Sequence, residues 1–316
     1  MNHGSSSPLA TPRQATNWID PATLMRIKNL ELRARLVVEG FFSGMHRSPF
    51  HGFSVEFTEY RQYSPGDDPR YLDRKLFARS DRYYIKRFED ETNLRCHVML
   101  DLSRSMDYGS LGYTKADYAR TLAATLAYFL NTQRDAAGLT TFHNELLDYL
   151  PARYRPGHLR RFMLLLEHAT AGDSTNLTKP LERAAELLRK RDVVILISDL
   201  LAPLAGLSTQ LAALVSRGQE VLVFQVLDPA ETTFAFQDAA LFVDAETGRE
   251  MYVDPAAMRA DYLQRLSAHQ LELQQMADRL GIDLVRLTKC HPLEEALFDY
   301  LQSRLHRGRV VRRRGK

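Results

Sequence analysis

Hydrophobic residues from about position 96 onward fall into short continuous runs that alternate with amphipathic stretches. Strands are expected at Cys96–Asp101, Ala136–Phe142, Leu146–Leu150, Val193–Asp199, Glu220–Val226 and Ile282–Leu287. Helices are expected at Lys115–Thr132, His158–His168, Pro180–Lys190, Pro203–Arg217, Pro255–Leu280 and Leu293–Arg304. Nearly continuous apolar strands that alternate with helices are typical of a parallel sheet covered on both faces. The pattern therefore predicts a doubly wound α/β fold with a mostly parallel sheet.

The rest of the chain divides into smaller units. Residues 1–19 are rich in Ser, Pro and Thr and are expected to form a disordered leader. A helix is expected to begin at Asp20, the N-cap residue, and to end near Gly40. It belongs to an N-terminal unit, residues 20–94, whose segment 44–95 carries ten of the chain's thirty aromatic residues and predicts a small β module. The large domain is expected at 95–306, with a β-hairpin inserted at about 228–254 and a basic tail at 307–316.

Composition narrows the function only slightly. The formal charge is +3, so no global field favours nucleic acid or a membrane surface. The mixture of Arg and Tyr in 61–95 could suggest RNA binding, but its acids nearly balance its bases, which favours ion pairs within the protein. Residues 304–316 hold seven Lys or Arg and no acid, and this stretch is expected to be a solvated end that could also dock an acidic partner.

The location follows from what the chain lacks at the level of sequence. The two cysteines match no zinc or redox spacing, and the chain has neither a run of 18 apolar residues nor an apolar stretch typical of a signal peptide at its start. We therefore expect a cytoplasmic protein with no membrane insertion and no nucleic-acid partner.

Polar oxygens gather where three predicted loops leave the sheet. Asp101, Ser103 and Ser105 form an Asp-x-Ser-x-Ser sequence at the end of the first strand. Thr175 lies in a loop before a predicted helix, and Asp199 ends the strand Val193–Asp199. Doubly wound sheets bind ligands at the carboxyl ends of their strands. Oxygen donors with few carboxylates suit Mg²⁺, or Mn²⁺, that keeps some water and an open coordination position.

These five residues resemble, in order and in strand context, the metal-ion-dependent adhesion site of von Willebrand factor A domains. In that family the first three residues and the Thr hold the cation, directly or through water, and the last Asp usually acts through water. A carboxylate of the partner completes the coordination. The resemblance therefore implies a von Willebrand factor A-like fold, a metal site at these five residues and a partner that offers an acidic residue. Arg104, between the two serines, would add a positive charge at the rim of the site.

A second resemblance covers most of the chain. The segments His46–Gly52, Tyr60–Tyr63, Pro65–Arg70, Ala78–Arg79 and Lys86–Asn93 resemble the signature of the bacterial domain of unknown function 58 family. The family usually has Asp-Trp where this chain has Asp73-Arg74, so the role of position 74 is open. Members are typically encoded beside MoxR-type AAA+ ATPases. The resemblance implies a metal-dependent adaptor, without catalytic activity, that works with such an ATPase in a chaperone or maturation system.

Other interpretations of the same residues remain. Asp101 and the two serines could cap the helix that follows them, and Thr175 could cap a helix near Leu177 as well as bind metal. The alternative function is an Asp101-dependent phosphotransferase or hydrolase, because this residue ends the first strand of a doubly wound sheet. Haloacid dehalogenase-like enzymes need a second Asp two positions later, where this chain has Ser103. The chain has no Walker A sequence and no Gly-x-Ser-x-Gly elbow, so the sequence favours binding over catalysis.

Overall fold

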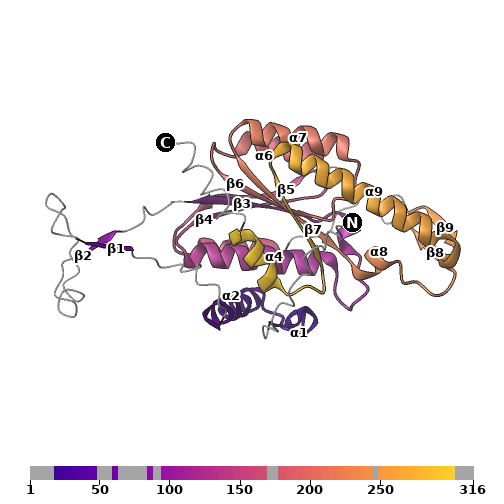
Figure 1. Ribbon diagram of the computed structural model, residues 1–316, viewed down its shortest axis with the longest axis horizontal. Coiled ribbons are helices and arrows are strands. Elements are labelled where there is room, and N and C mark those ends of the chain that lie inside the picture. The colour runs from indigo at the N-terminus through magenta and orange to yellow at the C-terminus, as the bar shows by residue number, and fades with distance from the viewer. Residues whose placement is uncertain are drawn as a thin grey trace, which may run out of the picture.

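The structure, a computed structural model, describes residues 18–47, 59–62, 84–87, 94–168, 177–244 and 248–302. Its centre is a six-stranded sheet with the strand order β10-β7-β6-β3-β4-β5 (Figure 1). The strands are β3 (Arg95–Asp101), β4 (Ala136–Phe142), β5 (Leu146–Arg153), β6 (Val193–Ser198), β7 (Glu220–Leu227) and β10 (Asp283–Thr288). All neighbouring strands are parallel except β5, which pairs antiparallel with β4 at one edge. The doubly wound, mostly parallel sheet predicted from the sequence is confirmed.

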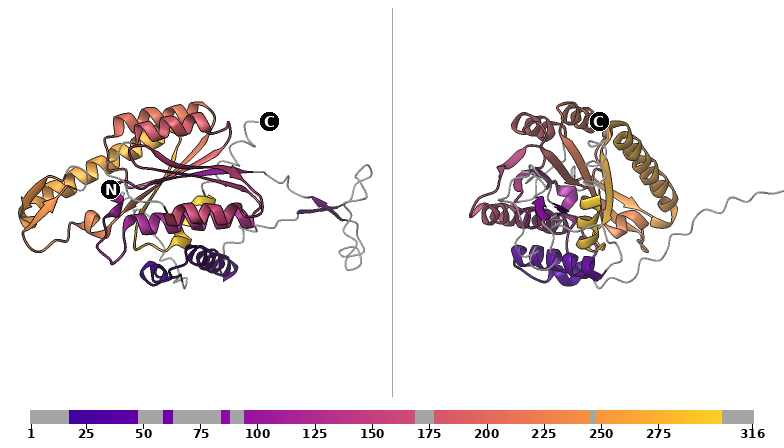
Figure 2. Two further views of the ribbon diagram at one scale, coloured as in Figure 1. Left: turned by 180° about the vertical axis from the view of Figure 1, so that it is seen from behind. Right: turned by 60° about the vertical axis from the view of Figure 1, so that its left-hand side comes forward.

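Helices cover both faces of this sheet (Figures 1 and 2). One face carries α2 (Leu30–Arg47), α4 (Lys115–Thr132) and α5 (His158–His168), and the other carries α6 (Thr178–Leu187), α7 (Leu204–Ser216) and α9 (Pro255–Leu280). Because successive side chains of a strand point to opposite faces, β6 contributes to two cores. Ile195 and Ile197 pack in the core that contains α4, whereas Val194 and Leu196 pack in the core that contains α7. Burial on both sides explains why this strand is apolar from Val193 to Ile197.

The N-terminal segment differs from the expected single helix. It forms two helices, α1 (Pro21–Met25) and α2, separated by a short break. Asp20 is the N-cap of α1 as predicted, and its side chain accepts a hydrogen bond from the backbone N–H of Thr23. A second cap signal lies at Asn29, whose side-chain oxygen accepts from the N–H of Leu32 at 2.7 Å, so a new helix begins after it. The prediction of one helix ending near Gly40 was wrong, because the apolar spacing continues across this break.

Tertiary contacts hold α1 and α2 against α4. Phe42 of α2 stacks on Phe129 of α4, with ring centroids 6.0 Å apart. Ile19, which the sequence places in the leader, donates its backbone N–H to Oε1 of the buried Glu294 at 3.2 Å. The described part of the chain begins at residue 18, within the last residues of the expected leader, and residues 1–17 lie outside it.

The insertion predicted at 228–254 is a β-hairpin, β8 (Ala240–Val243) paired with β9 (Glu250–Val253), preceded by a short helix α8 (Pro229–Thr233). This unit lies at the end of α9 that extends beyond the sheet (Figure 1). An aromatic contact joins the two, since the rings of Phe234 and Tyr262 lie 4.5 Å apart. The outer side chains Leu241, Val243 and Tyr252 are exposed.

The remaining boundaries are as follows. In the aromatic segment, β1 (Glu59–Gln62) and β2 (Tyr84–Arg87) form an antiparallel pair. The rest of 48–93, including Arg74, lies outside the described residues. The closing helix expected at Leu293–Arg304 is present over 293–302, and the basic tail 307–316 lies outside the described part. Among the described helices, none is long and apolar enough to cross a membrane.

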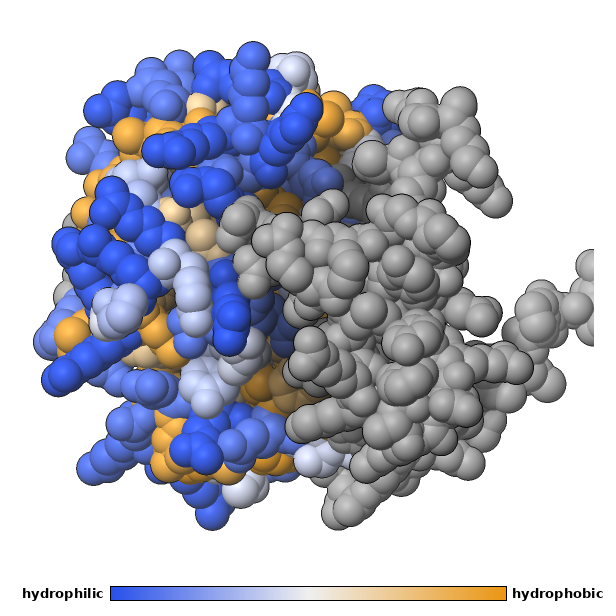
Figure 3. All heavy atoms as spheres, turned by 90° about the vertical axis from the view of Figure 1, so that its left-hand side faces the viewer, coloured by the Kyte–Doolittle hydropathy of each residue, from blue (hydrophilic) through white to orange (hydrophobic). Residues whose placement is uncertain are grey.

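The visible described surface at one end of the molecule is mostly hydrophilic. Figure 3 shows this end, which lies on the left in Figure 1, with hydrophobic residues in small separate groups between polar ones. Scattered apolar residues of this kind are normal for a folded protein and indicate no binding surface by themselves.

Candidate metal centre at the carboxyl edge of the sheet

Asp101 and Asp199, two of the predicted oxygen ligands, lie where the strand order reverses. From β3 the chain continues to β4 on one side of it, and later returns to place β6 on the other side. Because β3 and β6 are parallel neighbours, with Leu100 opposite Ile197, their carboxyl ends meet at one edge of the sheet. Asp101 ends β3 and Asp199 directly follows β6. This is the crevice where doubly wound sheets bind ligands.

The donors to Asp101 within the described part of the chain are neutral. Its Oδ1 accepts a hydrogen bond from the backbone N–H of Ser103 at 2.9 Å, and its Oδ2 accepts from the hydroxyl of Ser198 at 2.6 Å. The side chain is 0% exposed, and none of the described Lys, Arg or His side chains forms an ion pair with it. Burial, followed by the charge of Asp199, raises the pKa of Asp101 to about 7. A buried carboxylate without a positive partner is a group that a cation would stabilise.

The two serines of the loop turn toward each other. Their hydroxyl oxygens lie 3.1 Å apart, with Ser103 fully buried and Ser105 half-buried. Ser103 occupies the N-cap position of the short 3₁₀ helix Arg104–Asp107, but its side chain makes no capping hydrogen bond. The capping interpretation therefore does not account for this hydroxyl. Arg104 is exposed on the same turn.

Asp199 has a positive partner that the sequence analysis missed. Its Oδ2 lies 2.9 Å from Nζ of Lys115, and the same Nζ lies 2.6 Å from Oε1 of Glu231. Lys115 is 0% exposed. Burial lowers the pKa of this lysine, but the charges of Asp199 and Glu231 outweigh that effect and raise it above its ordinary value. The ammonium group is therefore charged between the two carboxylates.

One sequence signal could have indicated this contact. Lys115 is the first residue of α4, directly after the N-cap Thr114. A helix N-terminus carries partial positive charge, so a lysine there is unfavourable unless a carboxylate compensates it. A basic residue at this position therefore indicates an acidic partner elsewhere in the fold, although it does not identify that partner.

A second lysine pair lies beside the first. Lys289 and Asp228 are both fully buried, with Nζ 2.7 Å from Oδ2. Glu231 connects the two pairs, because its Oε2 accepts from the backbone N–H of Asp228 at 2.8 Å. Asp199, Glu231 and Asp228 thus share two ammonium groups, whereas neither of these lysines forms an ion pair with Asp101.

The structure thus brings together four of the five predicted ligands: Asp101, Ser103, Ser105 and Asp199. Thr175 lies outside the described residues. Within the described part of the chain, His, Cys, Asp and Glu form no group of three or more that could hold a metal ion. A cation at this edge would therefore depend on serine hydroxyls and water as well as carboxylates, a donor set that fits Mg²⁺.

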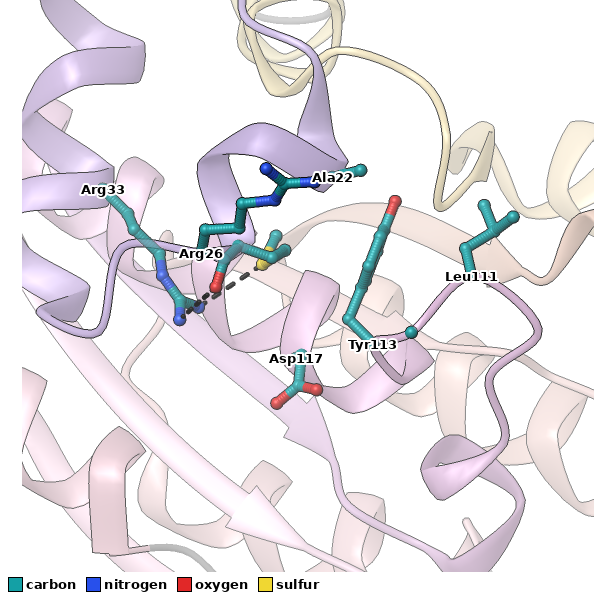
Figure 4. A pocket seen from close by; sticks show the side chains of 8 residues that line it. Ala22, Arg26, Arg33, Leu111, Tyr113 and Asp117 are labelled. Carbon is teal, nitrogen blue, oxygen red and sulfur yellow. Dashed lines mark hydrogen bonds between the residues drawn. The ribbon is translucent and has the colours of Figure 1, made fainter.

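A pocket of about 470 Å³ lies elsewhere, between the N-terminal helices and the start of α4 (Figure 4). Arg26, Arg33, Tyr113 and Asp117 are among its lining residues, and none of the predicted metal ligands lines it. The Arg33 guanidinium donates to the backbone carbonyl of Met25 at 3.1 Å, which satisfies the end of α1. Arg33 therefore links α1 and α2 structurally.

The chain is similar to several known proteins. The uncharacterized protein Rv1480 of Mycobacterium tuberculosis (strain ATCC 25618 / H37Rv) is 28% identical over 273 residues, which cover 85% of this chain and 85% of the relative. The conserved hypothetical protein BatB from Bacteroides thetaiotaomicron is a similar solved structure, with 14% identity and a TM-score of 0.45 over 66% of this chain and 98% of that chain. The SpRpn10 VWA domain is similar with 9% identity and a TM-score of 0.36, over 65% of this chain and 94% of that chain.

The family described as "Protein of unknown function DUF58" matches residues 59–272. The match spans more than half of the chain and includes Asp101, both serines and Asp199. It confirms the family resemblance found in the sequence. This chain therefore belongs to the DUF58 family.

Proposed function

We propose that this protein is a metal-dependent protein-binding adaptor without catalytic activity. Asp101, Ser103, Ser105 and Asp199, together with Thr175, hold Mg²⁺ or Mn²⁺, and an acidic residue of a partner protein completes the coordination. The observation that carries the proposal is Asp101, a fully buried carboxylate whose donors among the described residues are neutral, beside two hydroxyl oxygens 3.1 Å apart. A divalent cation supplies the missing positive charge at that position.

The chemistry of the donors supports binding rather than turnover. Serine hydroxyls contribute oxygens without neutralising a cation, so a cation held by few carboxylates keeps the charge needed to attract a partner's carboxylate. The exposed Arg104 adds a positive charge at the rim of the same loop. From the family resemblance, the partner is a MoxR-type AAA+ ATPase in a bacterial chaperone or maturation system.

The test has two stages. Mn²⁺ binding to the full chain is measured by calorimetry, and Asp101→Ala is expected to abolish it. Binding of the full chain to the MoxR-type ATPase is then measured by titration, once in Mg²⁺ and once in EDTA. Ser103→Ala/Ser105→Ala is expected to reduce partner binding to the level seen in EDTA, whereas partner binding that survives both changes contradicts the proposed contact.

The same proteins test the phosphotransferase alternative. Both carboxylate oxygens of Asp101 accept hydrogen bonds, and the side chain is 0% exposed, which hinders its use as a nucleophile. We expect no hydrolysis of p-nitrophenyl phosphate above background. Turnover that is present in the wild type and absent in Asp101→Ala would favour the enzyme and contradict the adaptor.

A further inference from the structure

Two features of the structure disfavour a positive charge at Lys115. It is the first residue of α4, where the helix dipole disfavours a cation, and its side chain is 0% exposed. Its Nζ is held 2.9 Å from Oδ2 of Asp199 and 2.6 Å from Oε1 of Glu231. A buried ammonium group persists only when carboxylates compensate it. The contact with Asp199 therefore places a fixed positive charge directly against one of the candidate metal ligands.

The fold holds this contact from several directions. The backbone carbonyl of Asp199 accepts a hydrogen bond from the side chain of the buried Gln225 at 3.0 Å. Glu231 is fixed in turn, because its second carboxylate oxygen accepts from the N–H of Asp228 in the capping box of α8. Lys115 itself is part of the first turn of an 18-residue helix. The ammonium group thus lies in a rigid setting between β6 and α8.

We propose that Lys115 sets the charge of the candidate metal centre by masking the carboxylate of Asp199, so that a divalent cation is balanced there by Asp101 alone. This inference rests on the proposed function and assigns a selectivity role to a residue outside the five predicted ligands. Its consequence is that the cation binds weakly by itself and retains positive charge. An anionic side chain of a partner then strengthens metal binding, and the metal strengthens partner binding by the same factor.

The second buried lysine provides a matched control. Lys289 is also 0% exposed, and its Nζ forms an ion pair of 2.7 Å with the fully buried Asp228. The other oxygen of Asp228 accepts from the hydroxyl of Ser110 and from the N–H of Ala230. Among the described contacts, the ammonium group of Lys289 forms no hydrogen bond or ion pair with Asp101 or Asp199. Removal of Lys289 therefore perturbs the same buried region without unmasking a predicted ligand.

The experiment measures the binding of Mn²⁺ alone to the full chain, followed by loss of the free-ion signal in electron paramagnetic resonance. Lys115→Met is expected to lower the Mn²⁺ dissociation constant about tenfold or more, since it removes a repulsive charge and frees a carboxylate. Lys289→Met is expected to change it by less than Lys115→Met does. Circular dichroism and thermal unfolding verify that each variant is folded.

A second set of variants tests the same inference in case Lys115→Met does not fold. Lys115→Met/Glu231→Gln removes one charge of each sign, and the amide oxygen of Gln can still accept from the N–H of Asp228. This double variant is also expected to bind Mn²⁺ more tightly than the wild type. Asp199→Asn is then added to both proteins. If Lys115 masks Asp199, this change weakens Mn²⁺ binding more in the double variant than in the wild type.

The outcomes separate this inference from the proposed function. Mn²⁺ binding by the wild type that is unchanged or weakened in both Lys115 variants contradicts the masking role and leaves the metal site standing. Absence of Mn²⁺ binding in the wild type and in every variant contradicts the metal site itself. Tighter binding in the Lys115 variants that depends on Asp199 supports the masking role.

Discussion

The buried carboxylate of Asp101 makes the folding stability of the metal-free protein decrease as pH rises. Its pKa rises from 3.8 to about 7 on folding, first because of burial and then because of the charge of Asp199. As pH increases from 3.8 to 7, the unfolded chain releases this proton before the folded protein does. The stability associated with the protonated carboxyl is therefore fully present below 3.8 and is lost as pH rises toward 7.

The size of the effect follows from this window. One pH unit corresponds to about 1.4 kcal/mol of folding free energy, so a shift of this width, from 3.8 to about 7, costs up to about 4 kcal/mol at pH 8. Asp101→Asn keeps the shape of the side chain and removes the charge. The N–H of Ser103 can still donate to the amide oxygen, and the hydroxyl of Ser198 can rotate to accept from the amide nitrogen. Metal-free Asp101→Asn is therefore expected to be more stable than the wild type at pH 8, by up to that amount.

Urea unfolding in EDTA at pH 5 and pH 8 measures this difference. The advantage of Asp101→Asn should be larger at pH 8, and added Mg²⁺ should raise the stability of the wild type only. Asp107→Asn, an exposed acid near the same loop, serves as the control and should change the free energy of unfolding by less than about 0.5 kcal/mol. An Asp101→Asn protein that is less stable than the wild type at pH 8 in EDTA would refute the reasoning.

Two further predictions concern groups away from the metal ligands. Burial, followed by the charge of Arg95, lowers the pKa of His97 from 6.5 to about 3, so the unfolded chain takes up a proton first as pH falls and stability decreases by about 1.4 kcal/mol per pH unit between 6.5 and 3. His97→Asn should flatten this part of the pH profile in urea unfolding, and an unchanged slope would contradict it. Thr114→Ala removes the capping box of α4 and should lower the free energy of unfolding by about 1 kcal/mol, whereas no change would show that tertiary contacts alone hold the helix start.

Much of the fold could be predicted because it is encoded locally. The run from Val193 to Ile197 is apolar at every position, and a strand buried on both faces requires that pattern. The Asp-x-Ser-x-Ser sequence also predicted that polar oxygens gather after β3, and the hydroxyl oxygens of Ser103 and Ser105 lie 3.1 Å apart there. His97 packs within its strand, and its Nε2 lies 2.6 Å from the hydroxyl oxygen of Thr140.

The break between α1 and α2 was not predicted, because periodicity reports which side of a helix faces the core and not whether the helix is continuous. A single capping side chain, Asn29, starts the second helix, and Arg33 then reaches back to the carbonyl groups that end the first. Such side-chain contacts with the backbone compete with apolar spacing over a few residues.

The amino-acid sequence by itself determined the apolar pattern of each strand, the loop at Asp101 and the family of this protein. These features depend on residues that are near one another in the chain. Only the tertiary structure decided the charge of the site. Lys115 and Asp199 are 84 positions apart in the sequence, and Asp101 and Ser198 are 97 positions apart. No periodicity relates residues so distant from each other. Pairing of buried charges depends on which strand ends become neighbours, and on the exclusion of water that makes an unpaired charge costly.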